Sequence, residues 1–115
     1  MSNTSNRIDF LSNLGALLVY AEDKGYDLIC AAFFRTPEEQ NALFKKGLSR
    51  CDGYIILSHH QLWLAVDLYL IKNGVLVTER CAEYEDLGSY WRGLGGVWEP
   101  IPGDIYHFEH GDNHV

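Results

Sequence analysis

The clearest strand of the chain reads Leu64-Ala65-Val66-Asp67-Leu68-Tyr69-Leu70-Ile71. Branched and aromatic residues of this kind favour the extended conformation. The segment Lys72-Asn73-Gly74 follows at once, and an Asn-Gly pair is typical of the tight turn of a β-hairpin. The sequence therefore predicts a strand at 64–71 that turns back into a second strand at 75–77.

Helical patterns lie on both sides of this hairpin. Apolar residues recur at helical spacing over 8–24, and Gly25 is suited to end that helix. The segment Thr36-Pro37-Glu38-Glu39 carries the N-cap, N1 and N3 residues of a helix start, which predicts a second helix that runs to Lys46. A third helix is predicted over 84–94, because its apolar spacing stops at two glycines.

Two shorter segments complete the predicted elements. Residues 27–34 form an apolar run that predicts a buried strand, with Cys30 as a small buried residue. Residues 104–109 predict a last short strand, and residues 47–57 a loop. The chain, 1–115 with a core at about 8–110, is therefore predicted to be a single α+β domain with about three helices packed on a small antiparallel sheet.

Composition and charge narrow the classes of function. The chain has 115 residues, 47% of them hydrophobic, which is enough for a buried core. Nine basic and sixteen acidic residues give a net charge of −7, which argues against nucleic acid and against an anionic membrane as partners. Three cysteines without a C-x-x-C pair predict neither a disulfide framework nor a thiolate zinc site.

The N-terminal region has no basic segment followed by a long apolar one. We therefore expect no signal peptide, and the apolar run at 16–21 is too short to span a bilayer. The protein is expected to be made in the cytoplasm.

Histidines and carboxylates near the strands are the main candidates for chemistry. His60 precedes the central strand and Asp67 lies within it, where a carboxylate is costly unless it is paired or binds a cation. His107 has Asp104 three residues before it and Glu109 two residues after it. Two histidines and one carboxylate fit a catalytic zinc site, which keeps a fourth position for water. On spacing alone, an exposed and hydrogen-bonded Asp67 is an equal alternative.

The spacing of His60 and Asp67 sets a condition on the backbone. Residues an odd number apart face opposite sides of a continuous strand. A turn or bulge within 61–63 is therefore required for both side chains to reach one metal ion.

A hydrolytic site needs two further groups, a proton acceptor and a cation or donor for the oxyanion. Asp104 is a candidate for the first, with Glu109 as its rival. If 104–109 is a strand, Glu109 shares a face with His107 and has the alternative role of hydrogen-bonding a ligand. Arg35, between a strand and a capped helix, is a candidate for the second; the alternative is a surface cation beside the glutamates that follow it. There is no H-E-x-x-H segment, which excludes the zincin arrangement.

Three ordered motifs resemble those of a known family. Residues 58–67, SHHQLWLAVD, look like the S-x-H-x-x-G-x-A-x-D signature of the VanY-like D-alanyl-D-alanine carboxypeptidase group of zinc peptidases, family M15. Residues 104–109, DIYHFE, look like its acid-x-x-His motif, and residues 34–40, FRTPEEQ, are similar to its arginine-containing strand-to-helix segment. The compact chain and the aspartate at 104 look most like the phage L-alanyl-D-glutamate endopeptidases, which are endolysins.

The resemblance implies a role for each matching residue. The implied ligands of Zn2+ are His60, Asp67 and His107. Asp104 takes the place of the catalytic acid and base, which accepts a proton from water and returns it to the leaving amine. Arg35 matches the residue that polarises the scissile carbonyl and stabilises the oxyanion.

The same resemblance points to two substrate-binding candidates and one departure. Ser58 and Gln40 are the implied substrate-binding residues, and the Ser58 hydroxyl has the alternative role of holding the ligand loop. Trp63 stands where the signature has glycine. Glycine suits a tight turn, so the presence of Trp63 leaves open whether the loop between His60 and Asp67 keeps the turn of the signature.

The resemblance implies an enzyme, a zinc-dependent peptidase that cleaves the peptide stem of bacterial peptidoglycan as a phage lysis enzyme. The alternatives are a D,D- or L,D-carboxypeptidase or dipeptidase of cell-wall metabolism, and a non-catalytic zinc-stabilised binding module. No extra cation for a terminal carboxylate stands out near the motifs, which favours the endopeptidase. We expect a monomer that acts on the cell wall after release, by a holin-type route if it is a phage enzyme.

The other histidines and aromatic residues are weaker candidates. His59 is expected at the surface or packed in a loop, and His110 and His114 in the tail of the chain. Trp91 and Trp98 are expected in the core, with a role in lining a substrate groove as the alternative.

Overall fold

The central strand β2 (Ala65–Lys72) lies between β1 (Asp27–Ala32) and β5 (His107–Glu109). Strand β4 (Val97–Trp98) continues the sheet beyond β5, and β3 (Val75–Leu76) pairs with the end of β2 through the predicted hairpin. The structure is a computed structural model, and it describes residues 3–111. All neighbouring strands pair antiparallel, so the predicted antiparallel sheet is confirmed.

Three helices accompany the sheet, as predicted. Helix α1 (Asn3–Asp23) begins earlier than expected, and α2 (Pro37–Lys45) has the complete capping box at Thr36. Helix α3 is Ala82–Gly93. A short 3-10 helix, η1 (His59–Leu62), was not predicted. No helix in the described part of the chain is long and apolar enough to cross a membrane.

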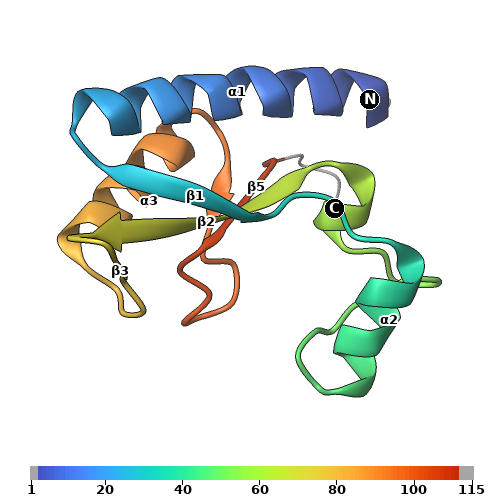
Figure 1. The fold of residues 1–115 in the computed structure, drawn as a ribbon. Helices are drawn as coiled ribbons and strands as arrows, with labels where there is room; N and C mark the ends of the chain where they lie inside the picture. The colour runs from blue at the N-terminus through green and yellow to red at the C-terminus, as the bar shows by residue number, and fades with distance from the viewer. Residues whose placement is uncertain (1–2, 112–115) are drawn as a thin grey trace.

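The hydrophobic core lies between one face of the sheet and helices α1 and α3 (Figure 1). On β2 the buried residues Val66, Leu68 and Leu70 point into this core. Because side chains alternate along a strand, Asp67 points to the opposite face. Helices α1 and α3 lie on the core side of the sheet, so neither of them covers the face that carries Asp67. Helix α2 projects away from the body of the domain (Figure 1).

Strand β1 corrects one prediction. The run 27–34 was expected to be a buried strand, but β1 ends at Ala32 and most of its residues are exposed, including Cys30. The reason is that β1 is an edge strand, which among residues 3–111 pairs with β2 alone. An apolar run favours a strand without showing whether it lies at the centre or the edge of the sheet.

Two tryptophans hold the segment around β5 in place. Trp91 and Trp98 are buried, which confirms the expected core packing. Trp91 Nε1 donates to the carbonyl of Glu109 and Trp98 Nε1 to that of Ile105, each at 2.8 Å. Trp98 packs so closely on α3 that a Cβ at Gly88 would lie 2.2 Å from its ring. These contacts anchor the backbone on both sides of His107, the first residue of β5.

A carboxylate on α3 joins this helix to the end of α1. Asp86 accepts hydrogen bonds from the hydroxyls of Tyr20 and Tyr26, each at 2.6 Å, and lies 3.6 Å from Lys24 Nζ. The two hydroxyls hold the pKa of Asp86 below its usual range. The ionised carboxylate is therefore the form that stabilises the fold.

Replacing Asp86 with asparagine is expected to lower the stability at neutral pH. A carboxyl whose pKa is depressed by folding contributes stability above its unfolded pKa and loses it as the pH falls through the folded value. The difference in melting temperature between wild type and Asp86→Asn should therefore shrink in acid. Thermal unfolding at neutral and acidic pH measures it, with Glu79→Gln, at an exposed position, as the control. A melting-temperature difference that grows in acid would contradict a stabilising role for the ionised Asp86 carboxylate.

Candidate metal centre and its cleft

Three side chains converge on the uncovered face of the sheet. In the antiparallel register of β2 and β5, Asp67 lies directly opposite His107, so both side chains point to the same face. Asp67 Oδ1 is 3.3 Å from His107 Nδ1 and 3.4 Å from His60 Nε2. The three ligand atoms lie within 4.8 Å of one another. The structure thus brings together the three predicted ligands.

The backbone between His60 and Asp67 satisfies the condition set by their odd spacing. Helix η1 covers 59–62, and Trp63 then turns the chain into β2 with φ 62° and ψ 35°. This left-handed conformation costs a residue other than glycine about 1–2 kcal/mol. The predicted turn is confirmed, and it has the geometry for which glycine is suited. Ser58 caps η1 with its hydroxyl, which accepts from Gln61 N.

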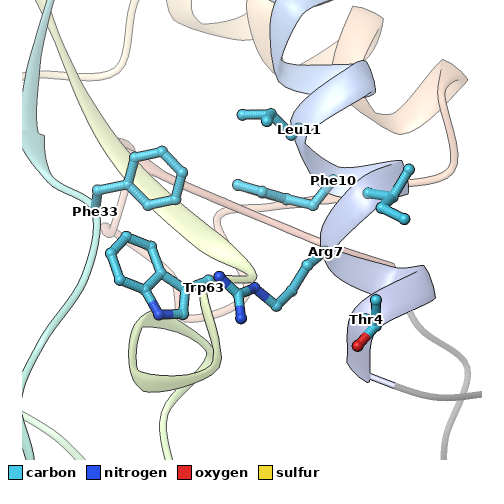
Figure 2. A pocket seen from close by; sticks show the side chains of 7 residues that line it. Thr4, Arg7, Phe10, Leu11, Phe33 and Trp63 are labelled. Atoms are coloured by element: carbon cyan, nitrogen blue, oxygen red, sulfur yellow. The ribbon is translucent and has the colours of Figure 1, made fainter.

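The side chain of Trp63 lies away from the metal centre. Its ring stacks on Phe34 at a centroid distance of 4.5 Å, and the guanidinium of Arg7 lies 5.5 Å from the ring centroid. Figure 2 shows the indole beside Phe33 in a hollow next to α1. Trp63 is not among the residues that line the cleft at the metal centre, so it does not fill the place of a substrate.

Hydrogen bonds at the far side of each imidazole prepare the two histidines as ligands. The carbonyl of Phe33 accepts from His60 Nδ1 at 2.9 Å, which leaves the Nε2 lone pair facing Asp67. His107 Nε2 donates to Glu109 Oε1 at 2.7 Å, which leaves Nδ1 facing the same point. Glu109 therefore orients a ligand, one of the two roles that the sequence left open for it.

The centre fits a zinc ion. His60 Nε2 and Asp67 Oδ1 are buried and make no hydrogen bond, which is unusual for buried polar atoms. Ligand bonds of about 2.0–2.1 Å in tetrahedral geometry place neighbouring ligand atoms about 3.3 Å apart. The separations of 3.3 and 3.4 Å at Asp67 Oδ1 agree with that spacing.

Charge at the centre favours a cation. Burial by itself raises the pKa of Asp67, but the imidazoles of His107 and His60 outweigh it and hold the pKa far below its usual range. Desolvation disfavours a charged His107, yet the carboxylates of Asp67 and Glu109 raise its pKa to about 9. A proton and a metal ion therefore compete for His107 Nδ1, and metal binding should release the proton.

The cleft beside the centre holds both predicted catalytic residues. Its volume is about 460 Å³, and Arg35 and Asp104 line it together with the three ligands. Asp104 Oδ2 lies 3.9 Å from His107 Nδ1, and its side chain is 40% exposed. Partial burial raises the pKa of Asp104. Arg35 Nη2 donates to Asp67 Oδ2 at 3.4 Å.

Gln40 lies behind Arg35. Its side chain is fully buried, and its Oε1 accepts from Arg35 Nη1 at 3.1 Å. Its Nε2 donates to Ser49 Oγ at 2.7 Å and to the carbonyl of Cys51 at 3.0 Å. The sequence assigned Gln40 to substrate binding and gave no sign of this contact, which holds the guanidinium at the edge of the cleft. Ser58, the other such candidate, does line the cleft, although its hydroxyl caps η1.

Arg50 is a cleft residue that sequence reasoning missed. It lines the cleft with Arg35, on the loop that follows α2. Backbone carbonyls of this loop bind the side chains of Gln40 and Asn41 on α2, through Cys51 and Asp52. Arg50 lies outside all three motifs, so only the contacts of the loop bring it to the site. His114 lies outside the described residues.

Comparison with known proteins gives a similarity of fold. No protein-family model and no curated protein sequence matches the chain. The chain is similar to several solved structures, and it spans 57–70% of the lengths of three of them. The Serratia marcescens L-Ala D-Glu endopeptidase ChiX is 19% identical over 74% of this chain and 67% of its own, with a TM-score of 0.60.

The other two structures cover more of this chain. The LdcB LD-carboxypeptidase is 18% identical over 89% of this chain and 57% of its own, with a TM-score of 0.62. The vancomycin resistance D,D-pentapeptidase VanY, solved in complex with Zn(II), is 22% identical over 89% and 70%, with a TM-score of 0.59. The chain therefore has the fold of these peptidases, at low sequence identity.

Proposed function

We propose that this chain is a zinc-dependent peptidase that acts on the peptide stem of bacterial peptidoglycan. The observation that carries the proposal is the convergence of His60 Nε2, Asp67 Oδ1 and His107 Nδ1 at the edge of an open cleft. Asp104 and Arg35 line the same cleft. The shared fold with ChiX, LdcB and VanY supports peptidoglycan as the substrate.

The residues of the cleft account for the steps of amide hydrolysis. When bound, zinc supplies a Lewis acid and lowers the pKa of water. Asp104 accepts the proton of the attacking water and returns it to the amine as the C–N bond breaks, a task for which a raised pKa is suited. Arg35, held by Gln40, donates to the oxygen that becomes negative in the tetrahedral intermediate.

The bond that is cleaved is the finer part of the proposal. The motifs and the similarity to ChiX support the L-alanyl-D-glutamate bond. The motif resemblance alone suggests a phage lysis enzyme that is made in the cytoplasm and reaches the wall after release, and this part of the proposal rests on the motifs only. Arg50 favours a second candidate, an L,D- or D,D-carboxypeptidase, because a second cation in the cleft suits a terminal carboxylate. Either activity uses the same zinc ligands.

Hydrolysis of a synthetic stem peptide is expected to stop when a chelator removes zinc and to return when zinc is restored. Mass spectrometry of the products identifies the bond, and a C-terminally amidated peptide separates the two candidates, because only a carboxypeptidase needs the free carboxylate. A fall in turbidity of permeabilised cells measures lysis. Cleavage that persists without metal would rule out the proposed mechanism, and zinc binding without turnover would indicate a binding module.

A further inference from the structure

Helix α1 is apolar on the face that points away from the domain as well as on the face that packs on it. Phe10, Leu14 and Leu17 are buried against the core. Between Asp9 and Glu22 the helix has no charged residue. Adjacent exposed apolar side chains normally mark a contact with another molecule, and the outer side of α1 lies at the top of the molecule with no other element over it (Figure 1).

The exposed residues form a regular stripe. Ile8 is 65%, Leu11 61%, Leu18 43% and Val19 61% exposed. The outer stripe, as we call it, consists of Ile8, Leu11, Gly15, Leu18 and Val19. The spacing 8, 11, 15, 18 alternates three and four residues, as in the seam of two paired helices. A Cβ at Gly15 would have no neighbour within 4 Å, so another backbone has room to approach closely at the middle of the stripe.

The charges at the two ends of the stripe are complementary. Arg7 lies at the N-terminal end, with Asp9 two residues later, and Glu22 and Asp23 lie at the C-terminal end, where the following Lys24 pairs with Asp86. Within residues 3–111 Arg7, Glu22 and Asp23 form no ion pair, and the contact of Arg7 is with the ring of Trp63. Two copies of α1 that pair antiparallel bring the arginine of each to the carboxylates of the other, whereas parallel pairing would bring like charges together.

A hollow lies beside the N-terminal half of the stripe. It measures about 470 Å³, and Arg7, Leu11, Phe33 and Trp63 are among the residues that line it (Figure 2). In antiparallel pairing this half of α1 faces the C-terminal half of the other helix. The hollow can then accept an apolar side chain of that half, such as Val19, in a mostly apolar surrounding.

We propose that a second copy of this chain docks on the outer stripe, with the two α1 helices antiparallel about a two-fold axis near Gly15. This replaces the expected monomer. An anionic bilayer is a poorer partner, because the chain carries a net charge of −7. None of the residues that line the cleft belongs to α1, so the dimer leaves the metal centre open, and the proposal stands or falls independently of the peptidase activity.

Sedimentation velocity over a wide range of protein concentration is the first test. The wild type is expected to form a dimer, and Leu11→Glu and Leu18→Glu each to weaken it at least about thirtyfold, as loss of a central interface residue does. Ile55→Glu is the control, since Ile55 is 88% exposed and lies far along the chain from α1. A wild type that stays monomeric, or a dimer that both variants retain, would overturn the proposal.

Cross-linking tests the position of the axis. In a background with Cys30, Cys51 and Cys81 replaced by serine, the variant Gly15→Cys is expected to form a disulfide-linked dimer under mild oxidation. The control Ile55→Cys is expected to stay monomeric. Cross-linking at Ile55→Cys but not at Gly15→Cys would place the interface elsewhere, and sedimentation of monomer with phosphatidylglycerol vesicles would show that a lipid surface covers the stripe instead. Either result would overturn the proposal.

Discussion

Replacing His60 with alanine is expected to abolish zinc binding and to reduce peptide hydrolysis to background. His60 Nε2 is one of the three candidate ligand atoms, and its ring is buried, so no other side chain is placed to substitute for it. Loss of a residue that hydrogen-bonds a metal ligand costs about 10–100-fold in metal affinity or in activity. Loss of a direct ligand should cost more, because two ligands no longer define the tetrahedral centre.

The measurement combines zinc titration calorimetry with the stem-peptide assay. The control is His110→Ala, which removes a nearby imidazole that is not one of the three ligands. The His60→Ala variant also leaves Asp67 without one of the imidazoles that stabilise its charge. Circular dichroism should therefore establish that His60→Ala remains folded. A folded His60→Ala variant that keeps activity would remove the basis for the proposed function.

Replacing Asp104 with asparagine is expected to lower kcat by about 10²–10⁴-fold, the usual contribution of a general acid and base. The amide keeps the size of the carboxyl but cannot accept the proton of the attacking water. Zinc binding should be retained, because Asp104 is not one of the three converging residues. Loss of kcat with zinc bound separates a role in chemistry from a role in holding the metal.

The matched variant is Glu109→Gln, which tests the rival proton acceptor. Glu109 Oε1 accepts a hydrogen bond from His107 Nε2. The substitution should therefore weaken zinc binding by about 10–100-fold, the usual effect of losing a residue that hydrogen-bonds a metal ligand. The two variants are compared at saturating zinc by kcat and by zinc affinity. If Glu109→Gln lowers kcat more than Asp104→Asn at saturating zinc, the two roles must be exchanged.

Local interactions account for most of the fold that the sequence predicted. The hairpin after β2 and the start of α2 depend on neighbouring residues, an Asn-Gly turn and the capping box at Thr36. The edge position of β1 was not predictable in this way, since it depends on which strands lie beside it. Helix η1 was not predicted because its four residues show no periodic pattern, although Ser58 and Gln61 form a capping box that marks its start.

The candidate ligands were predictable because their residue types and order carry the chemistry. An odd spacing between His60 and Asp67 even required the turn that Trp63 makes. The pairing of Asp67 with His107, by contrast, is set by the register of β2 and β5, forty residues apart in sequence. The sequence named the candidate ligands, and the sheet brings their side chains close enough to bind one metal ion.

The sequence by itself determined the hairpin after β2, the start of α2 and the set of metal-binding residue types, since these depend on conformational preferences and chemistry that each segment carries locally. Only the tertiary structure decided that Gln40 holds Arg35 from behind, that Arg50 enters the cleft, and that one apolar face of α1 is left uncovered. The physical reason is that burial and neighbourhood are properties of packing between distant segments, and apolar spacing along a helix shows which residues are apolar without showing which of its faces finds a partner.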